Sequence, residues 1–123
     1  MRYYYLFQPR GADMEKARNL LRSIKSNCDD RDVSDLINQL KDHCGRKRVL
    51  LAYVSTSESE LNHFQRRGFQ AAARRALYDF RQAKTDQRRR TCIDKFRYYL
   101  DLSGCSAGEF GVSQSQMEKF GQI

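Results

Sequence analysis

Apolar residues recur at intervals of three and four along most of this chain, which is the spacing of an amphipathic α-helix. Polar or glycine-containing stretches separate four such stripes. They predict helices over about residues 13–26, 33–44, 69–84 and 87–102. The stripes are Ala17, Leu20, Leu21, Ile24; Val33, Leu36, Ile37, Leu40, Cys44; Phe69, Ala73, Leu77, Phe80; and Cys92, Ile93, Phe96, Tyr99, Leu100.

Residues that favour helix ends flank these stripes. Asp13, Asp32 and Asp86 each precede a stripe, where an aspartate side chain can cap the first amides of a helix. Gly45 and Gly104 follow the second and fourth stripes, at positions where glycine commonly ends a helix. The polar stretch between residues 27 and 31 therefore predicts a loop between the first two helices.

A further short helix is expected to begin near residue 58, because Ser57 and Glu60 have the spacing of a capping box. On a helical wheel, Leu61 and Phe64 lie well away from the apolar stripe of the next helix, and Arg66 would enter that apolar face. A break at Arg66–Gly68 removes both conflicts. The sequence therefore predicts two separate helices on either side of Gly68.

Two segments are rich in residues that favour strands. Arg2–Gln8 is aromatic and is followed by Pro9, and Arg48–Ser55 is apolar with several β-formers. Strands separated by helices pair in parallel. The expected fold is therefore α/β but rich in helix, in the order β-α-α-β-α-α-α, with a small two- or three-stranded sheet packed by helices. A second copy of the chain could complete so small a sheet, so a homodimer is an alternative.

A chain of 123 residues and 14.5 kDa argues for one domain. We expect a single compact α/β domain over residues 1–102 and a flexible Gly- and Ser-rich tail over 103–123, with a short helix over Ser113–Phe120. No apolar run reaches the roughly 18 residues that span a membrane, and the start lacks the features of a secretory signal. A soluble, cytoplasmic protein that does not bind membranes is expected.

The basic charge is concentrated in one part of the sequence. The whole chain has a formal net charge of +8, and residues 61–97 contain 11 basic and 3 acidic residues, nine of the basic ones being arginine. Arginine is favoured where bidentate contact with phosphate or carboxylate matters. The alternative is a solvated helix surface with internal ion pairs to Asp79, Asp94 and Asp101, but three acids cannot neutralise eleven bases.

This basic segment supplies the candidate binding residues. Gln70, Arg74, Tyr78 and Arg81 are spaced by four, four and three, so they share one helix face opposite the apolar stripe. Guanidinium groups bind phosphates, and tyrosine or arginine can stack on bases. The candidate site for nucleic acid or an acidic partner consists of Arg66, Arg67, Gln70, Arg74, Arg75, Tyr78, Arg81, Arg88, Arg89 and Arg90.

The cysteines and histidines do not predict a metal site or a cofactor. Cys28, Cys44, Cys92 and Cys105 include no C-x-x-C pair, and the two histidines do not complete a zinc-binding pattern. Adjacent residues of a helix point about 100° apart, so a histidine beside a cysteine in the sequence is no evidence of a catalytic dyad. We expect no catalytic residues, no metal and no cofactor.

One segment has a partial resemblance to an enzyme family. Gln65-Arg66-Arg67-Gly68-Phe69-Gln70-Ala71 resembles the acyl-coenzyme A binding turn of GNAT-type acetyltransferases, in which a glycine after a strand lets backbone amides approach an anion. Gln65 and Gly68 match that pattern, whereas Gln70 departs from it because a small residue stands there in the family. The resemblance implies a degenerate acyltransferase that binds coenzyme A.

The leading interpretation is a small basic non-enzymatic protein that binds nucleic acid through an arginine-rich helical face, mainly by phosphate contacts. The main alternative is an inhibitor or adaptor that docks the same face on an acidic protein surface, because tyrosine and arginine are common at interface hot spots. Such a chain also suits an accessory protein of a phage or plasmid. The GNAT-like acyltransferase is a second alternative.

Overall fold

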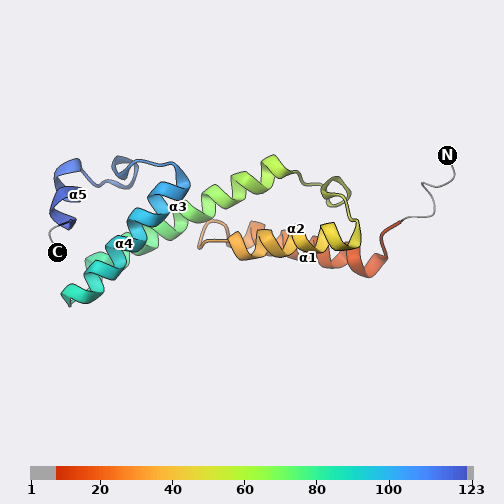
Figure 1. Cartoon of the computed structure of the whole chain (residues 1–123), viewed down its shortest axis with the longest axis horizontal. Coiled ribbons are helices and arrows are strands. Elements are labelled where there is room, and N and C mark those ends of the chain that lie inside the picture. The colour runs from red at the N-terminus through yellow and green to blue at the C-terminus, as the bar shows by residue number, and fades with distance from the viewer. Residues whose placement is uncertain (1–7, 122–123) are drawn as a thin grey trace.

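The computed structural model describes residues 8–121, which form an elongated all-helical molecule (Figure 1). The described part contains five α-helices, two short 3-10 helices and no β-strand. Their bounds are α1 Gly11–Asn27, α2 Ser34–Lys47, η2 Leu51–Val54, α3 Glu58–Gln82, α4 Asp86–Ser103, η3 Ala107–Phe110 and α5 Gln114–Phe120. The expected α/β fold with a small parallel sheet is therefore wrong.

The segment predicted as the second strand, Arg48–Ser55, is a compact turn. Arg48 and Ser55 both have positive φ angles, 53° and 62°, and η2 lies between them. The backbone amides of the segment bond locally, for example Val49 N to Cys44 O at 2.9 Å. Strand propensity depends on a partner strand, and the described chain offers none here. The other predicted strand, Arg2–Gln8, lies almost wholly outside the described residues.

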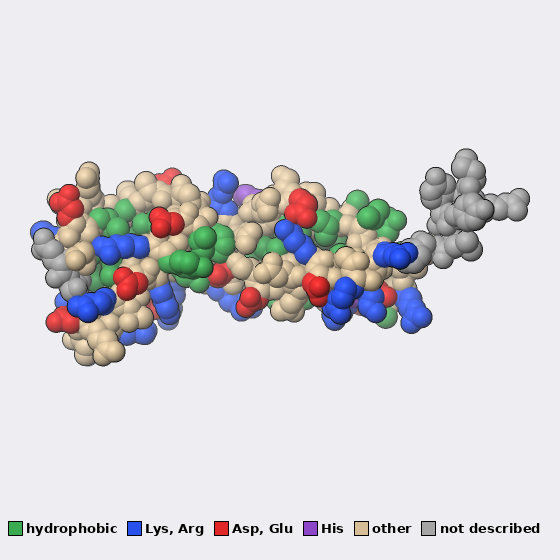
Figure 2. Space-filling view, in the orientation of Figure 1, with side chains coloured by type: hydrophobic (Ala, Val, Ile, Leu, Met, Phe, Trp, Pro, Cys, Tyr) green, Lys and Arg blue, Asp and Glu red, His purple; other side chains and the backbone are tan. Residues whose placement is uncertain are grey.

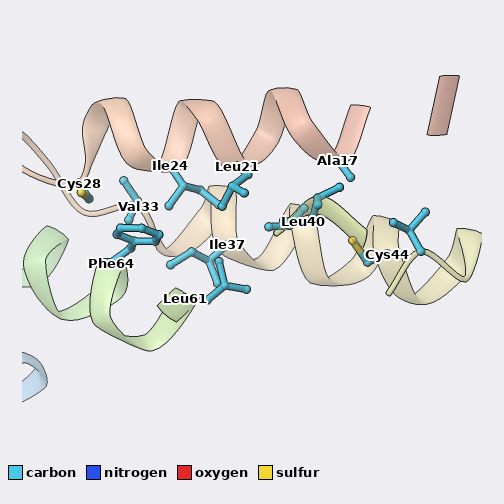
Figure 3. Packing of buried hydrophobic residues seen from close by; sticks show 12 residues of the cluster. Ala17, Leu21, Ile24, Cys28, Val33, Ile37, Leu40, Cys44, Leu61 and Phe64 are labelled. Atoms are coloured by element: carbon cyan, nitrogen blue, oxygen red, sulfur yellow. The ribbon is translucent and has the colours of Figure 1, made fainter. Parts of the chain in front are cut away.

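The first hydrophobic core lies between α1, α2, η2 and the N-terminal part of α3 (Figure 3). Leu21 and Ile24 of α1 face Ile37 and Leu40 of α2, and Phe64 of α3 closes the core from the other side. The buried members are Ala17, Leu21, Ile24, Cys28, Val33, Ile37, Leu40, Cys44, Val49, Val54, Leu61 and Phe64. Both predicted apolar stripes of the first two helices therefore belong to this core.

The second hydrophobic core lies between the C-terminal part of α3, α4 and the segment that follows α4. Its buried members are Ala73, Ala76, Leu77, Phe80, Cys92, Ile93, Phe96, Leu100 and Val112. The segment after α4 covers this core: the rings of Phe120 and Phe80 lie 4.6 Å apart, and Phe110 meets Phe96 edge-on at 5.8 Å. The assignment of residues 1–102 to a single domain stays a prediction.

Helix α3 runs without interruption through both cores (Figure 1), so the predicted break at Arg66–Gly68 is wrong. One side of the helix faces the first core and contains Leu61, Phe64 and Gly68. Another side faces the second core and contains Ala73, Leu77 and Phe80. With 3.6 residues per turn, the two sets centre on directions roughly 150° apart around one helix. The conflict on the helical wheel therefore reflects one helix that presents different faces to two cores.

Gly68 is buried inside this helix because another part of the backbone approaches it. A Cβ atom built on Gly68 would lie 2.8 Å from the carbonyl oxygen of Arg31 and 3.0 Å from the amide nitrogen of Val33. Both groups belong to the loop between α1 and α2. Glycine is needed here for close packing of backbone on backbone, whereas its conformational freedom is not used.

Several predicted helix ends are found and others move. The Ser57 side chain accepts a hydrogen bond from Glu60 N at 3.1 Å, as the capping-box spacing predicts, and Gly104 ends α4 with φ 70°. Helix α2, in contrast, continues past Gly45 to Lys47. The cap of α4 is Thr85, whose side chain accepts from Arg88 N, instead of the predicted Asp86. Within residues 8–121, no helix combines the length and the apolar character needed to cross a membrane.

Candidate functional site

The candidate binding residues lie on two elements. Arg66, Arg67, Gln70, Arg74, Arg75, Tyr78 and Arg81 all belong to α3, and Arg88, Arg89 and Arg90 lie near the start of α4. Figure 2 shows basic and acidic side chains interspersed along the whole length of the face that it draws. The number of basic side chains therefore does not by itself define a binding site. What distinguishes one arginine from another is whether it is paired with a group of the protein.

Three arginines of α3 form a row on one side of the helix. Arg66, Arg74 and Arg81 are separated by eight and seven residues, so an uninterrupted helix places them within an arc of roughly 80° and over about 22 Å of its length. All three side chains are exposed. We call these residues the α3 arginine row. The row exists because α3 is continuous at Gly68.

The members of the α3 arginine row have no partner within residues 8–121: the structure gives none of them an ion pair or a side-chain hydrogen bond. A guanidinium group with five donors and no protein acceptor is available for an external anion. The three predicted acidic partners do not neutralise the row. Asp79 pairs with Arg75 instead, and neither Asp94 nor Asp101 forms an ion pair in the described residues.

Three other candidate arginines are held by contacts within the protein. Arg67 binds the Asp29 carboxylate through Nε at 2.9 Å and through Nη2, and this bonding raises the pKa of the Arg67 guanidinium. The contact joins α3 to the loop after α1. Arg89 donates from Nε to the Ala83 carbonyl oxygen at 3.2 Å, which stabilises the C-terminal end of α3. Arg75 is held by Asp79, with Nε 3.3 Å from Oδ1.

Gln70 also contacts the protein itself. Its side chain is half-buried, and Nε2 lies 3.2 Å from Sγ of Cys105, just after α4. Gln70 was predicted to present its amide to a ligand together with Arg74. In the structure this amide instead donates to Cys105 and connects α3 with the segment that follows α4.

Tyr78 is the exposed aromatic residue beside the arginine row. It retains 56% of its accessible surface, and it lies one turn from both Arg74 and Arg81. The guanidinium carbon of Arg75 is 5.6 Å from the centre of the Tyr78 ring, which is within the range of a cation–π contact. Tyr78 therefore combines an accessible ring with cations on either side, Arg74 and Arg81, that have no ion pair in the described part of the chain.

The arginines at the start of α4 do not form one surface. Arg88 and Arg90 point to sides of α4 that are roughly 160° apart. Arg88 shares its side with Lys95, which lines a groove of about 270 Å³ together with Arg75, Asp79 and Tyr99. All three arginines lie at a helix N-terminus, where the helix dipole disfavours positive charge. This placement works against helix stability.

The resemblance of Gln65–Ala71 to an acyl-coenzyme A binding turn has no structural basis. The preceding segment is η2 and a short loop instead of a strand, and Gly68 lies in the interior of α3. Amides in a helix interior bond to carbonyl groups one turn earlier and do not point toward a ligand. Gly68 is moreover covered by the loop after α1.

Sequence reasoning missed the groups that determine which arginines are free. Asp29 is 38 residues from its partner Arg67, and no local pattern links them. Asp79 lies four residues after Arg75, so its ion pair follows a spacing that could have been recognised. Lys84, in the turn between α3 and α4, is a further exposed cation without an ion pair in the described residues. The four thiols of the chain form no disulfide.

Comparison of the chain with protein-family models, with curated proteins and with solved structures finds no match.

Proposed function

We propose that this protein binds nucleic acid through the α3 arginine row, with phosphate contacts supplying most of the affinity. The observation that carries the proposal is that Arg66, Arg74 and Arg81 are exposed, lie on one side of a single helix and have no ion pair or side-chain hydrogen bond within residues 8–121. Arginine binds phosphate oxygens bidentately, and each phosphate bound releases counterions. No catalytic step is part of the proposal.

The other arginines have supporting roles. Arg67 and Arg89 hold the fold through Asp29 and Ala83 and are not assigned to ligand contact. The Asp29 carboxylate offsets the charge of Arg67, whereas Arg89 is bonded to a neutral carbonyl group and its charge contributes to the surface potential. Lys84, in the turn after α3, extends the positive surface beyond Arg81. Ligand contact is therefore assigned to the outer side of α3 and not to the whole basic segment.

A double charge reversal tests the proposal. Arg74→Glu with Arg81→Glu should lower the affinity for an oligonucleotide at least roughly tenfold in a gel-shift titration, since two phosphate contacts become repulsive. Lys16→Glu with Lys25→Glu is the matched control. It changes the net charge equally, on α1, where both lysines are exposed and form no ion pair in the described residues.

Both double variants should keep the helical circular dichroism of the parent, because none of the four positions is buried. Equal affinity for the parent and the Arg74/Arg81 variant would contradict the proposal. An equal loss in the α1 control would indicate attraction by net charge without a defined site.

The alternative is an acidic protein partner for the same arginine row. Rim charges at protein interfaces affect mainly the association rate, whereas phosphate contacts give a steep and linear dependence of log affinity on log salt. A pull-down with and without nuclease distinguishes the two classes. Retention of an acidic protein after nuclease treatment, with no gel shift, would favour the alternative.

A further inference from the structure

The surroundings of Tyr78 indicate which form of nucleic acid the arginine row takes. Arg75 lies over the ring, with its guanidinium carbon 5.6 Å from the ring centre. Asp79 in turn holds Arg75 through the ion pair between Nε and Oδ1 at 3.3 Å. Tyr78 nevertheless retains 56% of its accessible surface. One face of the ring is thus in contact with a guanidinium that is itself paired with a carboxylate, and the exposed remainder is open to a planar ligand.

This arrangement reduces the cost of binding. An exposed tyrosine normally loses side-chain freedom when a ligand stacks on it. Here Arg75, itself paired with Asp79, contacts the ring before any ligand arrives, and this contact favours the ring position that the structure shows. The cation on the far face also makes the site favourable for a planar base, because arginine adds to the stacking of bases on aromatic side chains.

The phosphate-binding groups lie where a strand stacked on Tyr78 would need them. Arg74 precedes Tyr78 by four residues and Arg81 follows it by three, so one guanidinium without an ion pair among the described residues lies about one helical turn away on each side. A nucleotide strand alternates bases with phosphates. A base on Tyr78 would therefore have the flanking phosphates within reach of Arg74 and Arg81.

Tyr98 on α4 shows that exposure alone does not make such a site. It is 59% exposed, about as much as Tyr78, but its neighbours one turn away include two acidic residues, Asp94 and Asp101, beside the single cation Lys95. Its ring meets Tyr99 edge-on at 5.2 Å. Carboxylates beside the ring would repel the phosphates of a stacked strand. Tyr98 is therefore a natural control for Tyr78.

We propose that the α3 arginine row binds single-stranded nucleic acid, with an unpaired base stacked on the open face of Tyr78 and the neighbouring phosphates on Arg74 and Arg81. This inference rests on the proposed nucleic-acid function. In a duplex the faces of the bases are covered by their neighbours, and a ring projecting from a helix reaches a base face only if that base leaves the stack. A single strand offers its base faces freely.

The test measures binding by fluorescence anisotropy with labelled oligothymidylate, oligouridylate and a mixed-sequence duplex, each of about 12 units, a length within the usual range of single-strand sites. The parent should bind the single strands at least roughly tenfold more tightly than the duplex. Tyr78→Leu should lower the single-strand affinity by roughly 5- to 150-fold, the range of base–aromatic stacking, and leave duplex binding nearly unchanged. Tyr78→Phe and Tyr98→Leu should keep the parent's affinity.

The outcomes separate this inference from the function on which it rests. Equal affinity for duplex and single strand, or no effect of Tyr78→Leu, would overturn base stacking while leaving phosphate binding intact. Loss of binding to every oligonucleotide in the Arg74/Arg81 reversal is expected of both proposals. If polyglutamate displaces the oligonucleotides as well as unlabelled strand does, the row recognises anionic charge alone and the inference is wrong. The thymidylate and uridylate arms distinguish DNA from RNA as the source of the strand.

Discussion

Gly68 in the middle of α3 lies directly against the carbonyl group of Arg31, at a distance that leaves no room for a side chain: a Cβ atom at Gly68 would be 2.8 Å from that oxygen. The loop after α1 is thereby seated on α3 at the point where the helix passes from one core to the other. Asp29 of the same loop binds Arg67, and Asp32 accepts a hydrogen bond from Tyr99 of α4 at 3.2 Å. This loop therefore connects both α3 and α4 to the first hydrophobic core through side-chain hydrogen bonds.

Gly68→Ala should lower the free energy of unfolding by roughly 1–3 kcal/mol, because the added methyl group must displace backbone atoms of the loop. Gly45→Ala is the matched control. Gly45 lies within α2 and is exposed, with nothing within 4 Å of its Cβ position, so alanine there should raise stability by up to about 1 kcal/mol. Urea unfolding of both variants measures the difference. A more stable Gly68→Ala protein would show that the loop does not pack on α3 in this way.

Tyr99 should make stability depend on pH in the alkaline range. Burial and the nearby Asp32 carboxylate raise the pKa of the Tyr99 hydroxyl above its ordinary value of about 10. Between the pKa of the unfolded chain and the higher pKa of the folded protein, the unfolded state releases its proton first. The contribution of Tyr99 is therefore complete below pH 10 and is lost as the pH rises through the folded pKa.

Comparison with Tyr99→Phe isolates this effect. The variant lacks both the hydrogen bond to Asp32 and the ionisable group, so its free energy of unfolding should be lower than that of the parent at pH 8. This difference in free energy should become smaller above pH 10, where the parent loses the contribution of Tyr99. Urea titrations of both proteins at pH 8 and above pH 10 measure the difference in free energy of unfolding. Tyr53→Phe, at an exposed tyrosine of η2, controls for a general effect of removing a phenol. A gap that stays constant with pH would contradict the role assigned to Tyr99.

The four thiols should differ in reactivity. Burial raises the pKa of the Cys28 and Cys44 thiols, and Cys92 is also buried, whereas Cys105 is only half-buried. Because the thiolate is the reactive form, iodoacetamide should modify Cys105 first. Mass spectrometry of the native protein should find one rapid alkylation, which Cys105→Ser removes. Rapid labelling of Cys28 instead would indicate that the loop after α1 opens readily.

The salt dependence of binding should reflect the three guanidinium groups of the α3 arginine row, which form no ion pair within residues 8–121. Three or four phosphate contacts on a single strand give a slope of about −2 to −3 in a plot of log affinity against log salt. Arg66→Gln should remove one phosphate contact and make the slope shallower by about 0.7. Lys16→Gln on α1 should leave the slope unchanged. Anisotropy titrations at several salt concentrations measure both slopes. A slope near zero for the parent would exclude phosphate contacts as the main source of affinity.

Local patterns in the sequence are sufficient to predict much of the helical structure. The apolar stripes of α1, α2 and α4, the cap at Ser57 and the helix end at Gly104 all follow from the spacing of neighbouring residues, and the structure contains each of them. The same spacing places Arg74, Tyr78 and Arg81 on one side of α3. Helix periodicity is a short-range property, and a stripe of a few turns is enough to express it.

Long-range packing accounts for the features that these patterns did not predict. The apolar face of α3 changes direction because two cores lie on different sides of it, and Arg48–Ser55 turns because it has no strand to pair with in the described chain. Whether an arginine is free depends on where a distant carboxylate lies: Asp29 reaches Arg67, and nothing in residues 8–121 reaches Arg66. Sequence spacing specifies which side of its own helix a residue occupies, but what that side meets depends on how the helices pack together.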